Sequence, residues 1–238
     1  PFGFSEHYAR LKKGCAFLKW PMPKEADFHK GIRLFHQEIQ KDFMVRFNLT
    51  QETLDAPGPR QFESHAPTLY ATARPLRHNI QQAAPSTGVV GVSPWVASSP
   101  LVFPNHFKAA IYMTTRAIFR QHPEWADVLR LNEKGFVVDG GSSTPLWFDG
   151  KKVCFSPLEL GGLASVTRIK ILKICKANHI PTIEKAWKPA DALKKGEVLM
   201  AGSGVGVMGV THINGKKLKG TGEMTFRLWD CYRREVLK

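Results

Sequence analysis

The sequence predicts an α+β protein with two lobes. Three observations support this: apolar residues recur at helical spacing over residues 4–18, a hairpin signal stands at Asp149-Gly150, and a polar, turn-rich stretch ends at Gly88. Gly tolerates the positive φ that a tight hairpin turn requires, and clustered Pro, Ser, Thr and Gly are typical of connections. We therefore expect a first lobe over residues 1–80, a linker over 81–88 and a second lobe over 89–238.

The same local signals predict the elements of each lobe in order. In the first lobe, apolar periodicity predicts helices over residues 4–18 and 23–47, and a strand over 65–76 closes the lobe. The second lobe opens with a strand and a helix, over residues 89–96 and after 104–112. Its remaining elements are expected as β-structure over 135–148 and 152–155, a helix over 169–178, a Gly-rich loop over 200–208 and a final helix over 224–234.

Composition excludes several classes of protein. The 238 residues, 43% of them hydrophobic, are enough to bury a core, and no apolar run approaches the ~20 residues that span a bilayer. The nine histidines show no H-E-x-x-H pattern, so no metal site is expected. The four cysteines, Cys15, Cys154, Cys175 and Cys231, are widely scattered and form no C-x-x-C pair, so the sequence suggests neither a zinc site nor a disulfide scaffold. We therefore expect a reducing compartment, the mitochondrial matrix or the cytoplasm.

The net charge is the unusual property of the chain. Lys and Arg number 34 against 20 Asp and Glu, which gives +14 at pH 7. Such a field favours a polyanionic partner, RNA above all, or a compartment whose proteins are basic. The plainer interpretation is that paired lysines such as Lys194-Lys195 lie in solvated turns and aid solubility.

A Gly-rich loop over residues 161–168 runs directly into the helix expected at 169–178. The start of a helix presents unpaired backbone N–H groups and the positive end of the helix dipole, so it binds anions, of which phosphate is the commonest. Most Gly-rich loops that open helices are plain connections. The loop alone leaves both interpretations open.

The order of motifs around this loop resembles one known family. An acidic residue at Asp139, the pair Ser142-Ser143, an Asp-Gly hairpin and a Leu-x-x-Val-Thr-Arg helix start are similar in type and order to the class IV (fold-type IV) pyridoxal-phosphate aminotransferases. These include branched-chain aminotransferases, D-amino-acid aminotransferases and aminodeoxychorismate lyase. The resemblance covers nearly the whole chain. It implies a two-lobe fold like that of D-amino-acid aminotransferase, with an incomplete first lobe, because strands that precede the first helix in relatives are not in this sequence.

The resemblance also implies pyridoxal 5'-phosphate as the cofactor. Lys108 corresponds to the family's Schiff-base lysine, and Asp139 to the carboxylate that pairs with the pyridine nitrogen, so these two are the candidate catalytic residues. Arg10, in a Glu-His-x-x-Arg-Leu helix, corresponds to the arginine that holds the phosphate, which its planar guanidinium suits. The candidate cofactor-binding residues are Arg10, Lys108, Tyr112, Asp139, Val166, Thr167, Ser203 and Gly204.

Three positions depart from the family pattern. Asp139 stands where relatives carry Glu and is one methylene shorter, so contact with the cofactor requires a shift or a bridging water. Ile111 replaces an Asn that many relatives carry, and Thr144-Pro145 departs from their Ser-Ser-Asn run. These departures bear on activity more than on fold.

Two functions from different classes follow. The first is an aminotransferase, or a lyase of the aminodeoxychorismate type, that acts on an amino-acid or keto-acid substrate through Lys108 in a homodimer. The second is a catalytically degenerate class IV fold that serves as a basic structural subunit of an RNA-containing assembly, such as a mitochondrial ribosome. Retained Lys108 and phosphate-side residues favour the first, whereas the +14 charge and the replaced residues favour the second.

Overall fold

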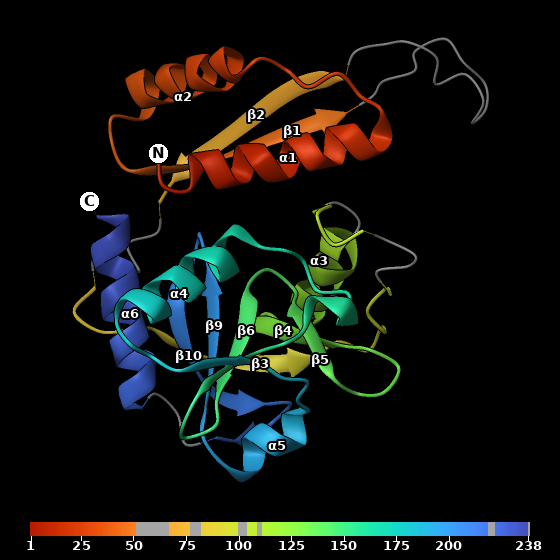
Figure 1. The fold of residues 1–238 in the computed structure, drawn as a ribbon, viewed down its shortest axis with the longest axis vertical. Coiled ribbons are helices and arrows are strands. Elements are labelled where there is room, and N and C mark those ends of the chain that lie inside the picture. The colour runs from red at the N-terminus through yellow and green to blue at the C-terminus, as the bar shows by residue number, and fades with distance from the viewer. Residues whose placement is uncertain (51–66, 77–81, 100–103, 109–110, 219–221, 238) are drawn as a thin grey trace. The chain divides into compact units, whose positions relative to one another are not determined.

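A computed structural model describes residues 1–50, 67–76, 82–99, 104–108, 111–218 and 222–237, without the side chains of 111–113. The chain divides into two compact units. One comprises Phe4–Arg77, and the other comprises Pro1–Gly3 together with His78–Lys238. In Figure 1 the Phe4–Arg77 unit is coloured red to orange, and the His78–Lys238 part of the other unit is coloured yellow to blue. Each is described by itself below.

The Phe4–Arg77 unit contains two helices and a two-stranded antiparallel sheet: α1 (Phe4–Leu18), α2 (Glu25–Ile39), β1 (Phe43–Thr50) and β2 (Thr68–Pro75). Helix α1 has the predicted bounds, but the helix predicted over residues 23–47 is wrong beyond Ile39. Gln40 adopts a left-handed conformation with φ of 50°, which ends α2. Apolar residues then stand at every second position from Phe43 to Leu49, which suits a strand. Phe47 of β1 packs on Phe28 of α2 with ring centroids 4.9 Å apart.

The larger unit is built on a mixed sheet (Figure 1). Its hydrogen-bonded order among the described residues is β5-β4-β3-β10-β9-β6-β7-β8, with β11 beside β10. Strand β3 pairs in parallel with both β10 and β4, and β7 pairs in parallel with β8. The strands are β3 (Thr87–Val92), β4 (Trp125–Leu131), β5 (Val137–Gly140), β6 (Thr144–Phe148), β7 (Val153–Phe155), β8 (Thr182–Glu184), β9 (Glu197–Gly202), β10 (Gly206–Ile213) and β11 (Lys216–Lys217).

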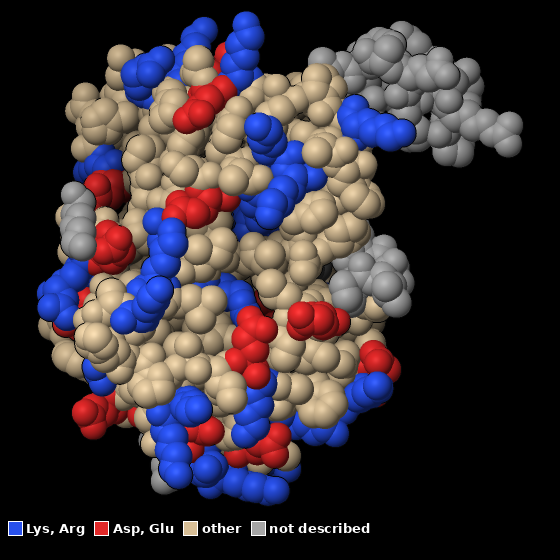
Figure 2. Space-filling view, viewed as in Figure 1, with Lys and Arg blue, Asp and Glu red and all other residues tan. Residues whose placement is uncertain are grey.

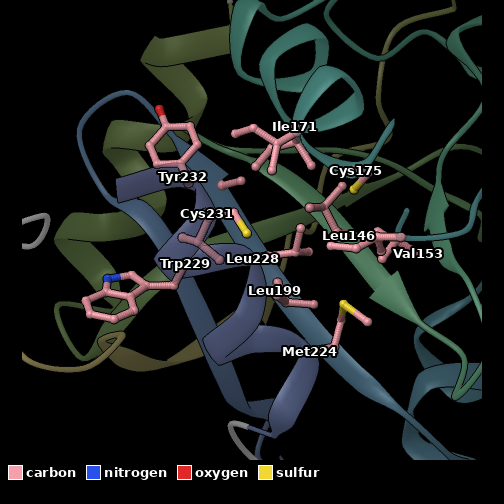
Figure 3. Close-up of a cluster of buried hydrophobic side chains, with 14 of the residues drawn as sticks. Leu146, Val153, Ile171, Cys175, Leu199, Met224, Leu228, Trp229, Cys231 and Tyr232 are labelled. Atoms are coloured by element: carbon pink, nitrogen blue, oxygen red, sulfur yellow. The ribbon is translucent and has the colours of Figure 1, made fainter. Parts of the chain in front are cut away.

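Two apolar cores cover the two faces of this sheet. Because successive strand residues point to opposite faces, Leu199 joins one core while Val198 and Met200 join the other. The first core includes residues of two helices, and Figure 3 shows their side chains against those of the strands. The helices of the unit are α3 (Ile111–Gln121), α4 (Val166–Ala177), α5 (Pro189–Lys194) and α6 (Glu223–Val236), with a 3₁₀ turn η2 (Leu158–Leu160).

A single carboxylate fixes the start of α6. Glu197, the first residue of β9, accepts hydrogen bonds from the backbone N–H groups of Gly222, Met224 and Thr225 and from the Thr225 hydroxyl. These N–H groups belong to the helix start, where no carbonyl of the preceding turn is present to accept them. A Cβ on Gly222 would lie 2.2 Å from Glu197 Oε1, so a larger residue there would displace the capping carboxylate.

Charged side chains cover much of the surface. Figure 2 shows Lys and Arg outnumbering Asp and Glu on the visible face, with acidic side chains interspersed among the basic ones. No helix in the described part of the chain has the length and apolar character that a bilayer crossing requires.

Replacing Glu197 with Ala should lower the free energy of unfolding by about 2 kcal/mol, because the buried N–H groups at the start of α6 would then have no acceptor. The exposed Glu159 in η2 gives a matched control, since its replacement by Ala should change stability by no more than about 0.5 kcal/mol. Urea denaturation of both variants measures the difference. Equal effects would contradict the capping role.

Candidate active site

The loop Gly161–Ser165, between η2 and α4, joins the two candidate catalytic regions. The Leu163 N–H donates to Asp139 Oδ2 over 2.9 Å. The next amide, that of Ala164, donates to the carbonyl of Asn105 over 2.8 Å. Asn105 lies three residues before Lys108, so consecutive amides hold the predicted carboxylate and the segment that carries the predicted lysine.

Asp139 is a buried carboxyl at the end of β5. Its Oδ1 accepts the N–H of Gly140 over 2.9 Å, so both oxygens have backbone donors. Burial raises the pKa of Asp139 to about 6, against the opposing effect of the Leu163 and Gly140 amides and of the charge of Arg130. The carboxyl therefore changes protonation close to neutral pH.

Arg130 lies directly opposite Asp139 in the antiparallel pairing of β4 and β5, so the two side chains share one face of the sheet. Arg130 is only 8% exposed, and its Nη1 has no hydrogen-bond partner among the described residues. Burial lowers the pKa of Arg130, and the Asp139 charge opposes this shift. The guanidinium is thus a buried positive charge beside the candidate carboxylate.

The start of α4 forms the predicted anion site. Ser165 is the N-cap: its Oγ accepts the N–H of Arg168 over 2.9 Å and lies 2.7 Å from Thr144 Oγ1. The N–H groups of Val166 and Thr167 stand in the first helical turn, where the helix itself supplies no acceptor. Both belong to the predicted site. The helix begins three residues earlier than predicted, at Val166.

The Thr167 side chain is buried and contacts Tyr232. Its hydroxyl hydrogen-bonds with Tyr232 of α6, and Thr167 is 5% exposed. Burial raises the pKa of Tyr232 to about 12, and the Thr167 hydroxyl opposes this shift. The backbone N–H of Thr167 is therefore the group that suits a bound phosphate.

The turn between β9 and β10 supplies the remaining phosphate-side residues. Ser203 is exposed in this turn and Gly204 follows it. Thr144 pairs with Ala201 in the β6–β9 register, so the base of the turn is next to the Ser165 cap. Ser203 and the start of α4 thus belong to one region of the larger unit.

Three predicted residues are placed less completely. Lys108 is exposed, and Tyr112 stands in the first turn of α3 with its side chain outside the described part of the structure. Arg10 lies on α1 in the other unit, with Nη2 3.5 Å from His7 Nδ1. Its participation in the site stays a prediction.

The donors that the larger unit brings together fit a phosphorylated pyridine by their chemistry. Amides at the positive end of α4 and the Ser203 hydroxyl suit a phosphate, and a buried carboxylate suits a ring nitrogen. No group of three or more metal-binding side chains occurs within the described residues. A surface hollow of about 460 Å³ beside Phe226 and Arg227 of α6 lies apart from all these residues.

Sequence reasoning missed two residues that shape the site. Ser165 was detectable, because Ser before a Val-Thr-Arg helix start is a favoured N-cap. Asp127 on β4, which contacts the turn after Asp139, carried no such local signal, since β4 itself was not predicted.

The fold and this site describe a protein of mixed α and β structure whose larger unit has a helix start suited to an anion. The sequence profile described as amino-transferase class IV matches residues 1–213, and the chain belongs to this family. No curated protein matches the chain at a significant level.

Solved structures of branched-chain aminotransferases share the fold. The enzyme of Thermoproteus uzoniensis, solved with norvaline, is 19% identical at a TM-score of 0.83, and the alignment covers 98% of this chain and 78% of that one. The Thermobaculum terrenum enzyme in its PLP form is 18% identical at 0.79, with 98% and 77% covered. The Escherichia coli enzyme is 18% identical at 0.77, with 94% and 75% covered. The predicted fold-type IV architecture is confirmed.

Asp139→Asn should alter how stability depends on pH. The folded pKa is about 6 against an ordinary 3.8, so the wild type loses stability as pH rises through this window and the loss is constant above it. Asn has no charge to bury. The unfolding free energy of Asp139→Asn relative to wild type should therefore rise by about 2 kcal/mol from near pH 4 to near pH 7.5. Denaturation at several pH values measures this, and a pH-independent difference would contradict the buried titration.

Proposed function

We propose that the protein is a pyridoxal-phosphate-dependent aminotransferase that acts on an amino acid and yields a keto acid. Family membership and the fold support this. The observation that carries the proposal is the pair of amides at Leu163 and Ala164, which tie Asp139 and the Lys108 segment to the loop that opens α4. Solved relatives include a PLP form and a complex with pyridoxamine 5'-phosphate.

Each residue has a distinct role in this proposal. The amides of Val166 and Thr167, the Ser203 hydroxyl and Arg10 hold the phosphate. Asp139 would pair with the ring nitrogen, and the charge of Arg130 favours the ionised form of Asp139. When bound, the cofactor supplies an electron sink for charge left on the substrate carbon. The Lys108 amine would hold the cofactor in the resting enzyme and, when free, would move the substrate proton.

A second function has separate support. The +14 charge suits a subunit of an RNA-containing assembly, and both oxygens of the shortened Asp139 already accept backbone N–H groups. In that case the class IV fold serves as a scaffold without a cofactor. RNA or ribosomal proteins would be its partners, in the mitochondrial matrix or the cytoplasm.

Cofactor titration tests the enzyme proposal directly. Purified protein with added pyridoxal phosphate should develop a visible absorbance band, and borohydride treatment followed by peptide mass spectrometry should find the pyridoxyl group on Lys108. Lys108→Ala should abolish both signals, because it removes the amine that the proposal assigns to the cofactor. Lys134→Ala, an exposed lysine near the start of β5, should leave both unchanged.

The outcomes separate the two functions. A Lys108-dependent signal together with keto acid from an amino donor supports the aminotransferase, and pyruvate release from an aminodeoxychorismate-type substrate would indicate the lyase instead. No signal, together with RNA binding that weakens steeply as salt rises, would support the structural subunit.

A further inference from the structure

A buried carboxylate on β4 holds the turn that follows Asp139. Asp127 is 1% exposed, and its Oδ1 accepts the N–H groups of Val128 over 2.8 Å and Ser142 over 3.1 Å. Its Oδ2 accepts the Ser142 hydroxyl over 3.0 Å and the Ser143 hydroxyl. Three of these four donors belong to the Gly140–Ser143 turn between β5 and β6. Burying a carboxylate is costly, and these bonds offset that cost only in this turn geometry.

The turn is also closely packed on its other sides. The Gly141 N–H donates to the Val128 carbonyl over 2.9 Å, and the Thr115 hydroxyl of α3 donates to the Gly141 carbonyl over 3.4 Å. A Cβ on Gly141 would lie 2.8 Å from Thr115 Cγ2 and 3.0 Å from Asp127 Oδ1. The backbone thus approaches the carboxylate as closely as only glycine permits.

This turn connects Asp127 to both ends of the candidate site. The Gly140 N–H is shared between Asp139 Oδ1 and the Ser143 carbonyl, at 2.9 and 3.1 Å. On the phosphate side, a Cβ on Gly202 would lie 3.3 Å from Ser143 Cβ, so Ser143 faces the residue before Ser203. A substitution at Asp127 is therefore expected to disturb both Asp139, on the ring-nitrogen side, and the Ser203 turn, on the phosphate side.

We infer that Asp127 is a positioning residue for the cofactor site: it fixes the Gly140–Ser143 turn, which orients Asp139 and supports the Ser203 turn. The inference deepens the proposed function and rests on it. Asp127 acts through hydrogen bonds to the turn and not by contact with the cofactor. Its charge also bears on Asp139, because it raises the pKa of that carboxyl while Arg130 lowers it.

Three variants separate this role from general stabilisation. Asp127→Ala removes every acceptor, whereas Asp127→Asn keeps one oxygen for the Val128 and Ser142 amides and lets the serine hydroxyls turn to accept from its NH₂. Asp149→Ala is the matched control. Asp149 also holds a turn, by accepting the N–H groups of Lys151 and Lys152 over 2.9 Å each, but in the hairpin between β6 and β7.

The measured quantity is the dissociation constant for pyridoxal phosphate, taken at temperatures where each variant is folded. Asp127→Ala should weaken binding roughly tenfold or more, and Asp127→Asn and Asp149→Ala should stay within about threefold of wild type. Amide exchange gives a second measurement. Asp127→Ala should speed amide exchange over residues 139–143 and 161–165. Asp149→Ala should speed exchange only in the hairpin between β6 and β7.

Each result decides the inference. Wild-type affinity in folded Asp127→Ala, or unchanged exchange over 161–165, would overturn it. If Asp127→Ala does not fold, Ser143→Ala, which removes the hydroxyl that donates to Asp127, should still weaken binding several-fold, and no weakening there overturns the inference. If wild type itself binds no pyridoxal phosphate, the proposed function fails, and the exchange pattern alone shows whether Asp127 orients Asp139.

Discussion

Two neighbouring peptide groups, those of Leu163 and Ala164, hold the candidate site together. One donates to the carboxyl of a buried strand end and the other to the segment before α3, so elements about 25 to 60 residues apart in sequence meet at a dipeptide. Backbone donors suit this task because they cannot be lost by side-chain substitution, and burial makes each bond costly to leave unmade. Gly162 allows the approach, since a Cβ there would lie 2.5 Å from the Val138 carbonyl.

Three buried charged side chains lie near this dipeptide in the larger unit. Asp127, Arg130 and Asp139 lie within two paired strands, and all three are at least nine-tenths buried. Two carboxyls and one guanidinium in such a place restrain each other's protonation, because burial penalises each charge while the opposite sign relieves it. The pKa of Asp139 therefore lies close to neutral pH, at about 6. An active class IV aminotransferase would use this shifted pKa, whereas a protein that kept the fold only as a structural subunit would not need it.

Local signals were enough for part of this architecture. The Asp149-Gly150 hairpin, the strand before it and the helix after the Gly-rich loop follow from turn chemistry and periodicity, and the motif order led to the family. The helix predicted over 23–47 failed because aromatic residues such as Phe43 and Phe47 satisfy helical spacing and strand alternation alike; packing on α2 decides between them. Asp127 escaped prediction for a related reason: its partners lie fifteen residues away, across a strand pairing that no local pattern reveals.

The contact between Thr167 and Tyr232 has a bearing on how the protein is made. The first turn of α4 rests against a helix encoded about 60 residues later, and the two are packed into one core (Figure 3). During synthesis the loop over 161–165 emerges well before its support exists. The first turn of α4 therefore gains this support only after α6 has been synthesised and has packed against it, so the candidate phosphate-binding loop cannot be fully ordered before the last helix is in place.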